Sequence, residues 1–128
     1  MEQDGTEPPA ILIVDDDSAV GSMLVRMIGR LLPAATVGTV LSAAQALEVL
    51  LVQRTDVVLT DLRMPDMDGA QLTQMIKARW PATRVMIISA SAEQLLGEIA
   101  QSVQADAYLA KPFSRDELAK VLFPLLGG

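Results

Sequence analysis

Short apolar runs alternate with longer amphipathic stretches five times along the chain. The apolar runs cover residues 10–14, 35–40, 56–60, 84–89 and 107–110, and their lengths suit interior strands of a sheet. The stretches between them repeat apolar residues at helical spacing. Strands that alternate with helices through short connections predict an α/β fold, in which a parallel sheet is covered by helices on both faces.

Five helices are expected, over about residues 18–32, 43–51, 69–80, 92–103 and 114–123. Ser42 is a candidate cap of the second helix, and Ser114 with Glu117 forms a capping-box pattern at the start of the fifth. Apolar residues at helical period are expected to face the core. They include Met23, Met27, Leu51 and Met75, and Met86 is placed in the core by its strand. Met64 and Met67 are expected to hold their loop against the body.

Composition limits the classes of protein. With 128 residues, 51% of them hydrophobic, we expect one domain over residues 10–126, a polar leader at 1–9 and a tail or linker start at 127–128. A secretory signal and a membrane-spanning run are both lacking in the sequence, which predicts a cytoplasmic location and no membrane partner. The net charge of −6 argues against nucleic-acid binding by this chain alone. The lack of Cys and His excludes thiol chemistry, Ser-His-Asp triads and imidazole metal sites.

Polar residues gather where the expected strands end. Asp15 and Asp16 follow the first strand, Asp61 follows the third, Ser89 closes the fourth and Lys111 follows the fifth. In a parallel α/β sheet these ends meet at one edge, where ligands bind. The sequence therefore predicts one site that holds three carboxylates, a hydroxyl and an ammonium group.

Three neighbouring carboxylates repel one another, and a hard divalent cation relieves that repulsion. Oxygen ligands in this small number favour Mg²⁺, or Mn²⁺, over Ca²⁺ and Zn²⁺. A carboxylate beside such a cation and a lysine forms an acceptor for a phosphoryl group. The structural alternative is that Asp17 and Ser18 cap the first helix, Asp61 caps a turn and Lys111 pairs with any acid.

Four segments resemble the receiver domain of two-component response regulators. They are residues 11–17 (ILIVDDD), 60–69 (TDLRMPDMDG), 88–90 (ISA) and 105–113 (ADAYLAKPF), in family order and at family-like spacing. The likeness runs from about Ala10 to Leu126. It implies a flavodoxin-like (βα)5 fold with strand order 2-1-3-4-5. One departure is Gln104, which stands where the family usually has glycine.

The resemblance also implies a role for each site residue. Asp61 would be the phosphoacceptor, and Lys111 would pair with the phosphoryl group and precede a cis peptide bond to Pro112. The metal would be held by Asp16 and Asp61 directly, by Asp15 mainly through water, and by the backbone carbonyl of Arg63. Ser89 would be the switch hydroxyl and Tyr108 the switch aromatic.

The expected function is therefore a phosphorylation-dependent switch that acts on no external substrate beyond its own phosphorylation and dephosphorylation. The implied partners are a sensor histidine kinase or a histidine phosphotransfer domain, and a downstream target on the face of the fourth helix, fifth strand and fifth helix. A weak or phosphorylation-dependent homodimer is also compatible with the resemblance.

Two alternatives belong to other classes. A phosphate-ester hydrolase with an aspartyl nucleophile needs a second aspartate two residues later, and Arg63 stands there. A phosphate-independent protein-binding module would not need the complete set of acids, hydroxyl and lysine.

Overall fold

A computed structural model describes residues 7–127 of the chain. Its sheet contains five parallel strands: β1 (Ala10–Val14), β2 (Thr36–Val40), β3 (Val57–Asp61), β4 (Arg84–Ser89) and β5 (Ala107–Ala110). Their order across the sheet is β2-β1-β3-β4-β5, and every neighbouring pair is parallel. The expected α/β class and strand order are confirmed.

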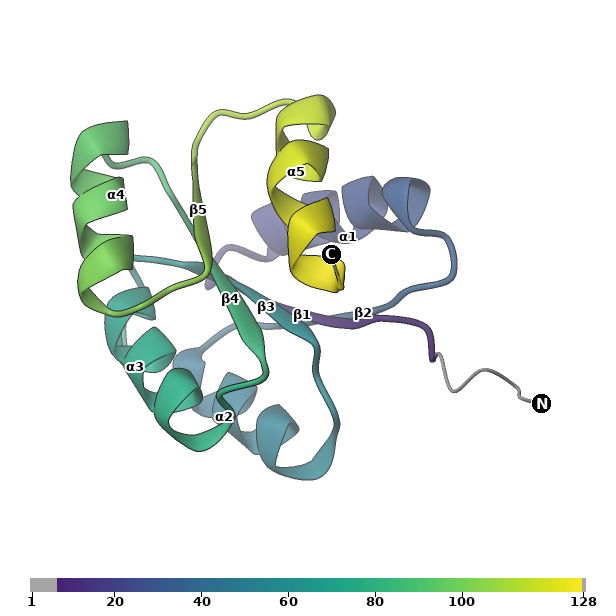
Figure 1. Cartoon of the computed structure of the whole chain (residues 1–128), viewed down its shortest axis with the longest axis horizontal. Helices are drawn as coiled ribbons and strands as arrows, with labels where there is room; N and C mark the ends of the chain where they lie inside the picture. Colours follow the sequence, from purple (N-terminus) through teal and green to yellow (C-terminus); the bar gives the residue numbers. More distant parts are fainter. Residues whose placement is uncertain (1–6, 128) are drawn as a thin grey trace.

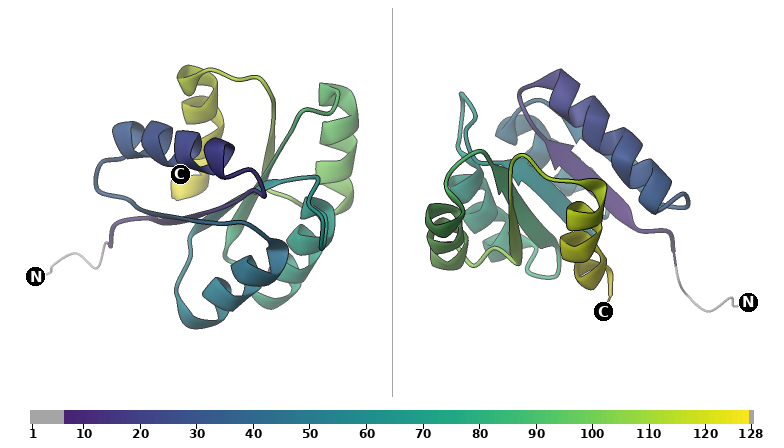
Figure 2. Two further views of the ribbon diagram at one scale, coloured as in Figure 1. Left: turned by 180° about the vertical axis from the view of Figure 1, so that it is seen from behind. Right: turned by 90° about the horizontal axis from the view of Figure 1, so that it is seen from above.

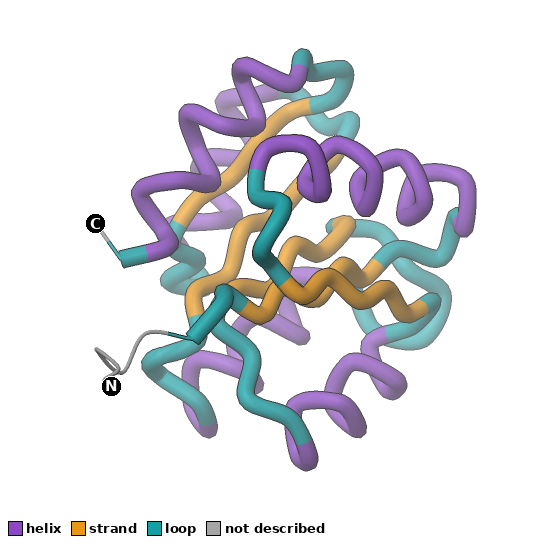
Figure 3. Tube along the Cα trace, turned by 90° about the vertical axis from the view of Figure 1, so that its right-hand side faces the viewer, coloured by secondary structure: helices purple, strands orange, loops and turns teal. Residues whose placement is uncertain are grey.

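The helices form two layers around the sheet. They are α1 (Ser18–Leu31), α2 (Ala43–Val52), α3 (Gly69–Arg79), α4 (Glu93–Ser102) and α5 (Arg115–Leu122). Figure 1 shows α1 and α5 together on one side and α2, α3 and α4 on the other, and both views of Figure 2 repeat this grouping. In Figure 3 the strands run between the two helical layers.

Alternation of side chains along the strands explains the two layers. On β1, Ile11 and Ile13 pack with α1 and α5, whereas Leu12 and Val14 pack with α2 and α3. A third group joins α4 to Ile87 of β4. Strands buried on both faces need nearly continuous apolar sequence, which is the pattern that the chain shows.

Most predicted boundaries agree with the structure to within a residue or two, and two differences concern strands. The second strand starts at Thr36 rather than at residue 35, and the third strand covers Val57–Asp61 rather than residues 56–60. Asp61 is thus the last residue of β3, paired in register with Ile88. The side chain of Asp56 instead accepts a hydrogen bond from the Ala10 amide at 2.8 Å.

Three apolar residues lie outside the core that was predicted for them. Met23, Leu51 and Met75 are 38%, 55% and 44% exposed. They stand at the margins of the apolar stripes, whose centres are occupied by other side chains. Met86 is fully buried, Met27 packs partly buried against the core, and Met64 and Met67 pack against the β1 and α2 side as expected.

The two ends of the described chain add short segments to the alternating strands and helices. After α5 a 3-10 helix covers Phe123–Leu126, with Pro124 in its first turn. Within the predicted leader, residues 1–6 lie outside the described part, and Arg54 contacts Glu7 and the Pro8 carbonyl. Gly128 of the predicted tail is also outside it. Among residues 7–127, helices long and apolar enough to span a membrane are absent.

Gln104, two residues after the last residue of α4, has a left-handed backbone conformation with φ of 61°. The amide of Ala105 donates to the Ala100 carbonyl at 2.9 Å, and the amide of Gln104 donates to the Gln101 carbonyl at 3.2 Å. This pair of bonds is the Schellman motif, in which glycine is preferred at the left-handed position. The backbone at Gln104 therefore has the left-handed conformation that glycine adopts readily and glutamine adopts less readily.

We expect Gln104→Gly to stabilise the domain by about 1 kcal/mol, because a non-glycine residue pays roughly that much in this conformation. Gln101→Gly is the matched control: Gln101 is exposed in the last turns of α4, and glycine there should cost about 1 kcal/mol. Urea unfolding measures both. Destabilisation by both substitutions would contradict the strain at Gln104.

Candidate functional site

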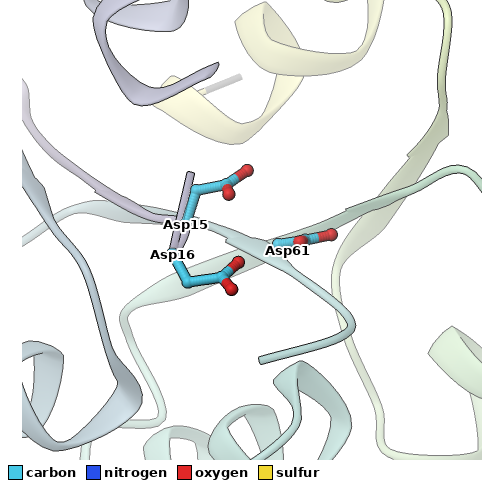
Figure 4. Close-up of side chains that lie close together, drawn as sticks. All are labelled: Asp15, Asp16 and Asp61. Carbon is cyan, nitrogen blue, oxygen red and sulfur yellow. The ribbon is translucent and has the colours of Figure 1, made fainter. Parts of the chain in front are cut away.

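Three carboxylates converge at the carboxyl edge of the sheet. Asp15 and Asp16 directly follow β1, and Asp61 ends β3, its neighbour in the sheet. One oxygen from each side chain lies within 4.8 Å of the others, and Figure 4 shows the three side chains side by side. The predicted acidic cluster is present because the register of β1 and β3 brings their ends together.

The backbone holds these carboxylates in place. Asp15 is 3% exposed, and its Oδ1 accepts a hydrogen bond from the Asp17 amide at 2.9 Å. Oδ1 of Asp61 accepts from the Leu62 amide, also at 2.9 Å. The side chain of Asp17 accepts a hydrogen bond from the Ala19 amide and caps α1. The alternative in which Asp17 is a helix cap is therefore confirmed. Asp15, Asp16 and Asp61 are left to form the site.

Lys111 brings the positive charge to the cluster. Its Nζ lies 3.7 Å from Oδ2 of Asp15 and 3.8 Å from Oδ1 of Asp61. Its amide donates to the Ser89 carbonyl at 2.8 Å, which fixes the end of β5 beside the end of β4. The Lys111-Pro112 peptide bond is cis, as the resemblance implies.

The electrostatics of Asp61 suit a cation. Burial raises the pKa of Asp61, Lys111 opposes the rise, and the negative charges of Asp15 and Asp16 add to it. The net effect is a raised pKa, so the ionised form of Asp61 is disfavoured without further positive charge. Three carboxylate groups with this excess of negative charge fit a hard divalent ion such as Mg²⁺ or Mn²⁺.

Ser89 and Tyr108 lie on β4 and β5, the two strands that follow β3 across the sheet. Ser89 ends β4 and is 3% exposed, and its Oγ contacts only Ser91 among the hydrogen bonds of the described residues. Tyr108 in β5 is 37% exposed. Arg63 lies two residues beyond Asp61 with an exposed side chain. The metal role of its carbonyl and the switch roles of Ser89 and Tyr108 stay predictions.

Gly69 and Gly97 lie close to the site residues Asp61 and Tyr108, and the spacing of the motifs did not predict either contact. A Cβ built on Gly69 would lie 2.2 Å from the carbonyl oxygen of Asp61, so the start of α3 touches the backbone of β3. A Cβ on Gly97 would lie 3.1 Å from the hydroxyl of Tyr108, so the tyrosine rests against α4. A glycine inside a predicted helix was the available signal for Gly97.

Removal of the Asp61 charge is expected to stabilise the metal-free protein by on the order of 1 kcal/mol, or several degrees in melting temperature. The Asp61→Asn side chain keeps the shape and escapes repulsion by Asp15 and Asp16. Thermal unfolding at pH 7 in EDTA measures the change, and Asp116→Asn, on the exposed surface of α5, is the control. Equal melting temperatures for Asp61→Asn and the wild type would contradict the repulsion.

Comparison with known proteins identifies the family. The family model described as "Response regulator receiver domain" matches residues 11–123. The DNA-binding transcriptional regulator NtrC of Escherichia coli (strain K12) is 37% identical over 107 residues, which cover 84% of this chain and 22% of NtrC. The chain thus spans less than a quarter of that relative's length.

Solved structures agree. The signal receiver domain of an HD domain-containing protein from Pseudomonas fluorescens Pf-5 has a TM-score of 0.86 at 28% identity, covering 94% of this chain and 88% of that one. Chemotaxis protein CheY4 of Vibrio cholerae, at 23% identity, shares the fold with a TM-score of 0.83, covering 93% and 99%. With the acids at the ends of β1 and β3 and the lysine after β5, these matches show that the chain belongs to the response regulator receiver domain family.

Proposed function

We propose that this domain accepts a phosphoryl group on Asp61 and works as a phosphorylation-dependent switch in two-component signalling. The observation that carries the proposal is the position of Lys111, whose ammonium lies 3.7 Å from Asp15 and 3.8 Å from Asp61. A carboxylate with an adjacent cation and acidic metal ligands is the arrangement that phosphoryl transfer to an aspartate requires.

The donor would be a phosphohistidine of a sensor kinase or a phosphotransfer protein. A carboxylate oxygen of Asp61 attacks the phosphorus, the bond from phosphorus to the imidazole nitrogen breaks, and that nitrogen keeps the electron pair. Lys111 stabilises the charge on the phosphoryl oxygens. Mg²⁺ or Mn²⁺, held by Asp15, Asp16, Asp61 and the Arg63 carbonyl, would supply further neutralisation of that charge when bound.

The output would be a shift between two conformations. The hydroxyl of Ser89 is drawn to the phosphoryl group, which frees space for Tyr108. A downstream target would read the change on the face of α4, β5 and α5. Leu95, Tyr108 and Phe123 on these elements or directly after them are 47%, 37% and 45% exposed, which gives a partner apolar surface to bury.

The domain acts in this proposal as a signalling switch whose only chemistry is its own phosphorylation and dephosphorylation. The cytoplasmic location expected from the sequence, and a homodimer that depends on phosphorylation, stay predictions.

Intact mass after incubation with acetyl phosphate tests the proposal. We expect the mass gain of one phosphoryl group in the wild type when Mg²⁺ is present, and none in EDTA. Asp61→Asn should show no gain, and the control Asp116→Asn should match the wild type. A gain of equal size in Asp61→Asn, or none in the wild type with Mg²⁺, would refute the assignment, and the latter would favour the phosphate-independent binding module.

A further inference from the structure

The Ser89 and Ser91 side chains form a hydroxyl pair at the start of the connection from β4 to α4. Their Oγ atoms are 3.0 Å apart, and the amide of Ser91 donates to Oγ of Ser89 at 3.1 Å. Ser89 is buried, and Ser91 is half-buried. Both hydrogen bonds of the Ser89 hydroxyl in the described part of the chain are therefore made by one residue, Ser91.

A hydroxyl has one proton to donate and two lone pairs that accept. The Ser91 amide occupies one lone pair of Ser89, and the Ser91 hydroxyl takes either the proton or the second lone pair. A phosphoryl group on Asp61 offers only acceptor oxygens. When the Ser89 hydroxyl moves toward that group, as the proposed function requires, it gives up its contact with the Ser91 hydroxyl, whichever of the two hydroxyls donates.

The neighbouring helix start shows that Ser91 is not needed as a cap. The N-cap position of α4 is Ala92, and no side chain caps this helix. Serine is a preferred capping residue, yet the hydroxyl of Ser91 is turned back to Ser89. The segment that carries Ser91 leads directly into α4, which belongs to the proposed partner face.

We propose that Ser91 is a positioning residue that holds Ser89 in the unphosphorylated conformation and so competes with the phosphoryl group for its hydroxyl. This inference rests on the proposed function. Ser91 acts through Ser89 alone. Part of the favourable free energy of the contact between Ser89 and the phosphoryl group is offset by the loss of the contact between Ser89 and Ser91. Loss of the Ser91 hydroxyl should therefore favour the switched conformation.

Calorimetry of the binding of beryllofluoride with Mg²⁺, a phosphoryl mimic, measures the competition. We expect Ser91→Ala to bind it about 2- to 10-fold more tightly, the range that one net hydrogen bond corresponds to. Ser91→Thr restores a hydroxyl and should return the affinity toward that of the wild type. Ser102→Ala, which removes a hydroxyl bonded to the Ile99 carbonyl at 2.8 Å elsewhere on α4, should leave it unchanged.

A double-mutant cycle with Ser89→Ala separates this role from a general structural one. Ser89→Ala alone should weaken beryllofluoride binding, and Ser91→Ala should then have no further effect. Unchanged or weaker binding by Ser91→Ala, or the same gain in the Ser89→Ala background, would overturn the role of Ser91 while leaving the phosphoryl-acceptor proposal intact. A wild type that does not bind the mimic, or binding unaffected by Asp61→Asn, would overturn both proposals.

Metal-free NMR spectra provide a readout that is independent of binding. Ser89→Ala should shift the Ser91 amide proton upfield and speed its exchange, because the amide loses its acceptor. Ser91→Ala should keep that amide protected. An unshifted Ser91 amide in Ser89→Ala would contradict the hydrogen bond on which the inference depends.

Discussion

Gly69→Ala is expected to destabilise the domain by about 3 kcal/mol or more, which corresponds to roughly 10 °C or more in melting temperature. A Cβ at this position would lie 2.2 Å from the carbonyl oxygen of Asp61 and 3.1 Å from Cα of Leu62. Both are backbone atoms, which cannot turn away as a side chain does. The Gly69 amide also donates to the Leu62 carbonyl at 2.7 Å, so α3 cannot shift without loss of that bond.

The same substitution should disturb the proposed phosphoryl transfer, because any movement that relieves the contact displaces Asp61. Gly29→Ala is the matched control: Gly29 is exposed within α1, and no atom lies within 4 Å of its added Cβ. Alanine there should stabilise the helix by about 0.5–1 kcal/mol. Calorimetry of the two variants decides the matter, and a Gly69→Ala protein as stable as the wild type would show that the contact is not rigid.

Asp106→Leu is expected to cost about 2–3 kcal/mol, because one carboxylate connects three elements at the amino edge of the sheet. Its Oδ2 accepts from Lys77 Nζ at 2.9 Å and from the Val85 amide at 2.8 Å, and Arg84 lies 3.4 Å from Oδ1. Lys77 and Asp106 are only 17% and 16% exposed. Leucine would leave the Val85 amide without its acceptor and the shielded Lys77 ammonium without its carboxylate partner, with only the Pro81 and Thr83 carbonyls to accept from it. Asp106→Asn keeps an acceptor oxygen and should lose less in urea unfolding.

The contribution of Asp106 should also depend on pH. Burial acts to raise the pKa of Asp106, but the hydrogen bonds from Lys77 and Val85 and the charge of Lys77 outweigh it, so the pKa is lowered. A lowered folded pKa gives stability that is present above the unfolded value of about 3.9 and is lost as pH falls through the folded value. The difference in unfolding free energy between wild type and Asp106→Asn should therefore be constant from pH 5 to 7 and shrink below about pH 4. A difference that grows in acid would contradict this sign.

The features that sequence predicted well depend on strong local patterns. Val57, Val58 and Leu59 form a short, mostly β-branched apolar run that favours a buried strand. The residues at the strand ends meet because the carboxyl ends of parallel strands lie at one edge of the sheet. That rule alone predicts that the acidic cluster and Lys111 lie together. Ser114 and Glu117 likewise gave the start of α5, since both capping-box hydrogen bonds are local.

The features that sequence did not predict depend on contacts between residues far apart in the chain or on the exact width of an apolar helix face. Periodicity gives the direction of an apolar stripe but not its width, so Met23 and Met75 were placed in the core and are exposed. Lys77 and Asp106 are 29 residues apart, and no local pattern pairs them. The contact of Gly69 with Asp61 depends on where α3 enters the fold, which is set by packing of the whole layer.

In this parallel sheet the amino ends of the strands lie at one edge and their carboxyl ends lie at the opposite edge. Val85, whose amide binds Asp106, and Ser89 stand four residues apart on β4, about 13 Å along an extended strand. Substitutions separated by more than about 7–10 Å without common partners usually have additive free energies. Substitutions of Asp106 and Lys77 at the amino edge are therefore expected to change the stability of the domain with little effect on the acidic cluster at the opposite edge.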